Sequence, residues 1–95
     1  MNQDKIKSYI GFAIKSRKIK YGVDELLKMP RTELIILSSD LAENSKKKIN
    51  SKFEGKTQII EFKPEVFKFF FGSDSIKVAA ITDKNLSEAI IKQEV

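Results

Sequence analysis

The chain has 95 residues, a formal net charge of +5, and neither cysteine nor histidine. A hydrophobic share of 41% beside a charged share of 33% is typical of a soluble globular protein, and this length predicts one domain spanning residues 1–95. The missing residue types exclude disulfides, thiolate or imidazole metal sites, and histidine-based catalysis.

Catalytic and membrane signatures are missing as well. The acidic residues form no cluster typical of a paired-acid or two-metal site, and the glycines are too far apart for a phosphate-binding loop or a dinucleotide fingerprint. No apolar run approaches the roughly 18 residues of a membrane span, and the first residues lack the apolar stretch of a signal peptide. We therefore expect a cytoplasmic, non-catalytic protein that binds no cofactor, no metal and no membrane.

The first third of the chain contains two helical patterns separated by a glycine. Apolar residues at helical spacing predict a first helix over residues 3–17, followed by a short extended piece over residues 19–21. Gly22 interrupts the chain. A second helix over about residues 23–29 ends before Pro30, because proline disfavours helical geometry in the residue that precedes it.

Strands and helices alternate through the rest of the chain. A continuous apolar run over residues 33–38 predicts a strand buried on both faces, and Ser39 and Asp40 are candidate caps for the next helix. The alternation predicts an α/β protein, a three-layer α/β/α sandwich around a central mixed sheet of about four strands. The further elements expected are a helix over residues 42–53, a strand over 57–62, a helix over 64–71, a strand over 76–82 and a last helix capped by Asp83.

A lysine surface and one phenylalanine outside the predicted core each allow two interpretations. The helix over residues 42–53 carries a lysine surface that suits either solvent or RNA, formed by Lys46, Lys47, Lys48 and Lys52. Phe67, Phe70 and Phe71 lie on one helical stripe and are predicted to be core. Phe69 points elsewhere, which makes it a candidate for base stacking or protein contact.

The net charge is confined to the beginning of the chain. Residues 1–31 contain eight basic and three acidic residues, which gives +5, whereas residues 32–95 contain ten of each. One-sided basicity of this kind indicates a phosphate-bearing partner, and a solvated lysine surface is the alternative.

Within this basic third, one turn combines cations, a glycine and acids. Lys18 and Lys20 precede Gly22 and are expected to contact phosphates. Asp24 and Glu25 follow in the first turn of the predicted helix, where acids either accept hydrogen bonds from base amino groups or simply stabilise the helix. Lys28, about one turn further on, suits the acceptor atoms of guanine.

Three segments resemble a known superfamily. They are the glycine turn over residues 21–28, the segment over residues 34–49 with its Asp40, Asn44, Lys47 and Lys48 pattern, and the late segment over residues 71–83. Together they are similar to ribosomal and ribonucleoprotein components that bind kink-turn RNA, in particular to the small bacterial YlxQ-like branch. The similarity covers nearly the whole chain.

The resemblance implies a function and a set of RNA-binding residues. Such proteins recognise a sharply bent RNA duplex with tandem sheared G·A pairs, and a loop before the last strand packs against an extruded nucleotide. The implied partners are structured RNA of ribosomal or kink-turn type, together with ribosomal proteins. The roles fall on Gly22, Val23, Asp24, Glu25 and Lys28, and on the loop formed by Gly72, Ser73, Asp74 and Ser75.

The chain also departs from the pattern of this superfamily. Position 24 is Asp where many kink-turn binders carry Asn, and the late loop reads Ser-Asp-Ser where an apolar or arginine-bearing sequence is common. An alternative therefore stays open, namely a protein interaction module of the same fold that has lost strong kink-turn recognition. An enzyme is the least favoured of the three classes.

Overall fold

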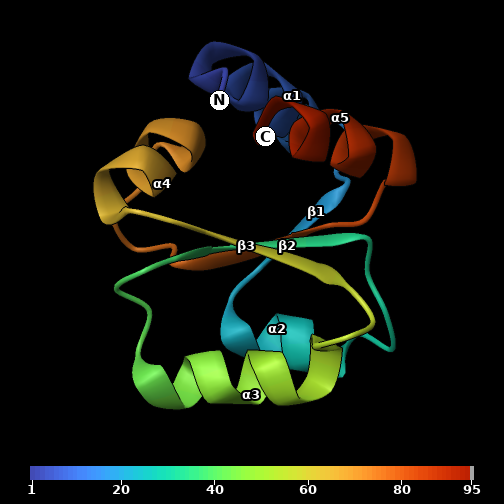
Figure 1. Ribbon diagram of the computed structural model, residues 1–95, viewed down its shortest axis with the longest axis vertical. Coiled ribbons are helices and arrows are strands. Elements are labelled where there is room, and N and C mark those ends of the chain that lie inside the picture. The colour runs from blue at the N-terminus through green and yellow to red at the C-terminus, as the bar shows by residue number, and fades with distance from the viewer. Residues whose placement is uncertain (95) are drawn as a thin grey trace.

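The computed structural model describes residues 1–94 and has five helices and four strands in this part of the chain. Helices and strands alternate along most of the chain, as the sequence pattern predicts (Figure 1). In order, the elements are α1 (Gln3–Lys15), β1 (Ile19–Tyr21), α2 (Val23–Lys28), β2 (Leu34–Ser38), α3 (Glu43–Phe53), β3 (Gln58–Phe62), α4 (Pro64–Phe71), β4 (Val78–Ile81) and α5 (Lys84–Glu94).

The four strands form one mixed sheet in the order β1-β4-β2-β3. β2 and β3 are parallel, whereas β4 runs antiparallel to both β1 and β2. β2 and β4 are the two inner strands, and every residue in them is buried. This arrangement confirms the α/β class, the central mixed sheet and the strand with two buried faces.

Helices cover both faces of the sheet, which gives the three-layer sandwich (Figure 1). Successive side chains of a strand point to opposite faces. Leu34 and Ile36 therefore join the cluster under α1, α4 and α5, whereas Ile35 and Leu37 join the cluster under α2 and α3. The apolar run of β2 thus supplies both cores at once.

Most predicted boundaries agree with the structure to within two residues. Asp83 caps α5 as expected, because its Oδ2 accepts a hydrogen bond from the backbone N–H of Leu86 at 2.9 Å. The capping role expected for Ser39 and Asp40 is wrong. α3 begins after Ala42, whose side chain makes no cap, and the Asp40 carboxylate turns instead toward Ser38 and Lys77.

Candidate nucleic-acid interface

Gly22 fixes where the chain turns from β1 into α2. Its φ of 88° and ψ of 150° lie in a region that side-chain-bearing residues rarely adopt. The Gly22 N–H donates to the Val78 carbonyl at 3.2 Å, and its own carbonyl accepts from the Leu26 N–H at 3.1 Å. The turn is therefore joined to the beginning of β4 and opens α2 with no side-chain cap.

The six-residue helix α2 buries its apolar side chains and exposes its charged ones. Leu26 is fully buried in the cluster under α2 and α3, and Val23 packs against the same cluster. Asp24, Glu25 and Lys28 are exposed, and Lys28 Nζ lies 3.8 Å from Glu25 Oε1. The structure thus places all three predicted base-contacting side chains on the solvent side of one short helix.

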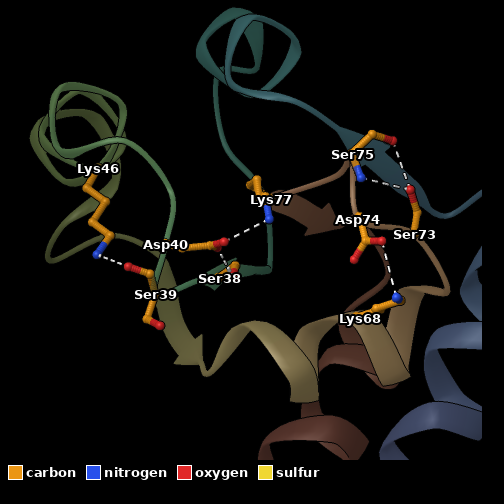
Figure 2. A network of polar contacts seen from close by, with 9 residues as sticks. All are labelled: Ser38, Ser39, Asp40, Lys46, Lys68, Ser73, Asp74, Ser75 and Lys77. Atoms are coloured by element: carbon orange, nitrogen blue, oxygen red, sulfur yellow. Dashed lines mark hydrogen bonds and ion pairs between the residues drawn. The ribbon is translucent and has the colours of Figure 1, made fainter.

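The late loop is held mainly by its own hydrogen bonds. Gly72 ends α4 in the left-handed conformation, with its N–H donating to the Lys68 carbonyl at 2.7 Å. Ser73 Oγ accepts from the Ser75 N–H at 3.2 Å, and the two serine hydroxyls lie 2.9 Å apart. Asp74 pairs with Lys68 at 3.1 Å, which ties the loop to α4 (Figure 2).

The glycine turn and the late loop lie at the same end of the paired strands β1 and β4, because the turn follows β1 and the loop precedes β4, which runs antiparallel to it. The Tyr21 ring packs edge-on against Phe71, the last residue of α4, with 6.4 Å between ring centroids. On the other side of the loop, Val78 accepts the hydrogen bond from Gly22. Two residues that flank the loop, Phe71 and Val78, therefore contact the glycine turn. Burial in this contact region raises the pKa of the Tyr21 hydroxyl.

The two lysines before the glycine behave differently from each other. Lys18 Nζ lies 3.3 Å from Asp83 Oδ1, at the end of β1 opposite Gly22. Lys20 is exposed and alternates with Ile19 and Tyr21, so it points to the face of the sheet that α2 covers. The structure thus places Lys20 two residues from Gly22, whereas Lys18 lies at the other end of β1 beside Asp83.

The ion pair at Lys18 contributes to a change in the pKa of Asp83. Several interactions lower this pKa from its ordinary value, the hydrogen bond from the Leu86 backbone N–H most and the one from Lys18 next. The lysine therefore stabilises the charged form of a helix cap.

Sequence reasoning missed a polar cluster next to the late loop. Lys77 Nζ lies 2.8 Å from Asp40 Oδ2, and Ser38 donates to the other carboxylate oxygen (Figure 2). These contacts lower the pKa of Asp40, the hydrogen bond from Lys77 most and that from Ser38 next. The pairing of β2 with β4 brings these residues together, since the Ser38 N–H donates to the Lys77 carbonyl at 2.8 Å. The sequence alone does not reveal this contact.

A small cavity of about 280 Å³ opens between α4, the late loop and the end of β2. Its lining combines serine hydroxyls, lysine ammonium groups and two carboxylates with apolar carbon, so a small group with polar edges finds both donors and acceptors there. The residues that line it are Ser38, Pro64, Glu65, Phe67, Lys68, Ser73, Asp74, Ile76 and Lys77.

Residues 1–94 carry neither a metal-binding cluster nor a membrane-spanning helix. This part of the chain contains no group of three or more acidic, cysteine or histidine residues placed to hold a metal ion. None of its helices has the length and apolar character needed to cross a membrane.

The comparisons with known proteins support the fold alone. No protein-family model matches the sequence, and no curated protein matches it either. The structure of this chain is similar to that of a protein with unknown function from Bacillus halodurans C, with a TM-score of 0.76 and 22% sequence identity. The similarity covers 93% of this chain and 94% of that one, so the two share their whole architecture.

Proposed function

We propose that this chain is a non-catalytic, cytoplasmic RNA-binding protein that recognises a kink-turn-like RNA, as part of the ribosome or of its assembly. It would then belong to the kink-turn superfamily, in the YlxQ-like branch that it resembles. One observation carries the proposal: the two segments expected to contact RNA, at Gly22–Lys28 and Gly72–Ser75, lie at the same end of the paired strands β1 and β4, where Gly22 bonds Val78 and Tyr21 packs against Phe71.

The exposed charges of α2 suit the edges of bases in a bent duplex. A kink opens the groove and exposes guanine acceptors, which Lys28 can reach as a donor, and base amino groups, which Asp24 and Glu25 can accept from. Lys28 and Glu25 are both largely exposed and 3.8 Å apart. Ion pairs of this exposed kind are weak, so RNA can take over either partner.

Carboxylates on this surface favour readout over simple adhesion. Two acids beside a basic segment weaken non-specific attraction to phosphate, so their presence at the turn is explained either by stabilisation of the first turn of α2 or by a contact other than phosphate. Hydrogen bonding to base amino groups is such a contact. We assign the cavity beside the late loop to the extruded nucleotide that the resemblance implies, with Lys68 and Lys77 near its polar edges.

The test is a binding comparison between two RNAs of matched length. One carries a kink-turn, and in the other Watson–Crick pairs replace the tandem G·A pairs. We expect the kink-turn to bind at least about tenfold more tightly at physiological salt, while both affinities fall as salt rises through counterion release. Equal affinities would show that the protein binds RNA through its positive charge alone and does not recognise the kink-turn. Binding to neither RNA would contradict the proposal and favour the protein interaction module.

A further inference from the structure

A second surface lies on the opposite side of the sandwich from α2, on the outer face of α1 (Figure 1). A hollow of about 400 Å³ runs along this helix and is lined by Lys7, Ser8, Gly11, Phe12 and Lys15. Gly11 is one of the lining residues, and a Cβ added there would meet nothing within 4 Å. The hollow is therefore open to solvent and walled by one aromatic ring and two lysines.

The side chains around the hollow are unusual for a helix face that faces only solvent. Phe12 is 60% exposed, and Phe69 on the neighbouring helix α4 is 40% exposed. Lys7 Nζ lies 4.5 Å from the centroid of the Phe69 ring, which holds this lysine at the edge of the hollow. Phe12, Lys7 and Phe69 thus extend one aromatic and cationic surface from α1 onto α4.

The charge of this surface selects the kind of partner. α1 carries Lys5, Lys7 and Lys15 against the single acid Asp4, and no acid lines the hollow. Lysine is depleted at the core of protein–protein interfaces, whereas lysines interleaved with exposed aromatic rings are the usual surface for a flexible nucleic acid strand.

We infer that the outer face of α1 binds single-stranded nucleic acid, with one base stacked on Phe12 and the flanking phosphates on Lys7 and Lys15. The two lysines are eight residues apart, or about 12 Å along the helix, and Phe12 lies between them. This site is separate from the surface at α2, and it does not depend on the proposed kink-turn function.

The test uses a fluorescently labelled uridine dodecamer and its thymidine counterpart, with binding followed by anisotropy at low and moderate salt. Phe12→Ala should weaken binding of the dodecamer at least about fivefold, because stacking contributes strongly for each base. Lys7→Gln and Lys15→Gln should each reduce the slope of log affinity against log salt by about 0.7. The strand held more tightly identifies RNA or DNA as the natural ligand.

Matched variants separate the site from general effects. Ile14→Ala removes a neighbouring exposed apolar side chain, and Lys56→Gln removes an exposed lysine between α3 and β3, so both should leave dodecamer binding nearly unchanged. Gly11→Glu should abolish binding by placing an anion in the hollow, although it replaces glycine in a helix and so favours folding.

Three results would overturn the inference. One is a wild-type protein that does not bind either dodecamer at low salt, and another is a Phe12→Ala variant that binds as wild type does. The third is self-association in sedimentation experiments that Phe12→Ala abolishes, since the partner would then be a second copy of the chain. Kink-turn affinity is measured in parallel and should not change in Phe12→Ala, so failure of this site and failure of the proposed function are distinguishable.

Discussion

The two ends of β1 carry basic residues that lie close together in sequence but occupy different environments. At one end, Lys18 pairs with Asp83 and reinforces the cap of α5. At the other end, Gly22 directs the chain into α2, whose charged side chains remain exposed. The cations of one sequence motif therefore divide into a lysine with a structural partner and residues that are available to a ligand.

The division follows from strand geometry. β1 pairs with β4 in antiparallel register, with Ile19 opposite Ile81 and Tyr21 opposite Ala79. Lys18 consequently lies where β4 ends and α5 begins, whereas Gly22 lies where β4 begins. Proximity along a chain does not place residues in one site when an extended strand separates them.

The largest expected effect comes from Gly22→Ala. Its added methyl group has free space, so the cost arises from the backbone conformation and should lower the free energy of unfolding by about 1–3 kcal/mol. Gly11→Ala is the matched control, since its methyl also has free space but its position is helical, and it should raise stability by up to about 1 kcal/mol. Chemical denaturation measures both. Equal shifts in the two variants would show that Gly22 has no special conformational role.

Lys28→Ala and Lys18→Ala test the comparison between the two ends directly. Lys28→Ala should weaken kink-turn binding by about 1–3 kcal/mol while leaving the straight duplex nearly unaffected, because it removes a base contact. Lys18→Ala should lower the melting temperature, through loss of the Asp83 partner, without changing the preference between the two RNAs. Titrations with both RNAs check this. A reversed pattern would place the RNA at the Lys18 end.

Lys20→Ala distinguishes phosphate attraction from base readout. Lys20 is exposed on the edge strand and has no predicted base partner. Its loss should weaken kinked and straight RNA about equally and reduce the salt slope by about 0.9. A loss confined to the kink-turn would assign Lys20 to readout instead.

Asp24→Asn is expected to have a smaller effect, and of opposite sign. It removes a negative charge beside phosphates and adds amide donors, so kink-turn binding should tighten by about 1 kcal/mol or less. Gly22, not Asp24, is the cap of α2, so the melting temperature should barely change. Asp24→Ala relieves repulsion without supplying a hydrogen bond and should bind less tightly than Asp24→Asn. Weaker binding by Asp24→Asn than by wild type would show that a carboxylate is required.

The smallest expected effect is that of Asp40 on how the stability of the protein changes with pH. Its pKa is lowered in the folded protein by Lys77 and Ser38, so the folded state favours the ionised form. The stabilisation is present at neutral pH and is lost as pH falls through this lowered pKa. Asp40→Asn should therefore reduce the melting temperature slightly at neutral pH and leave it unchanged in strong acid. Thermal melts across this range check the prediction, and a difference that grows on acidification would contradict it.

The fold could be predicted from the sequence because its signals are local. The apolar run of β2 and the Gly and Pro boundaries each reflect preferences of a few neighbouring residues. The partner of Lys18 could not be predicted, because Asp83 comes near only through the antiparallel pairing of β1 with β4. The Asp40–Lys77 pair depends in the same way on the pairing of β2 with β4. Roles in RNA contact remain predictions.

The hydrogen bond from Gly22 to Val78 also bears on when the protein becomes competent during synthesis. Val78 belongs to β4, which is made after the other three strands that the structure describes and pairs with both β1 and β2. A nascent chain that ends before β4 can have its basic N-terminal third exposed but lacks the acceptor that fixes the turn. If the proposed RNA binding is correct, we expect shape-selective binding to arise only after β4 has been made and has paired with β1.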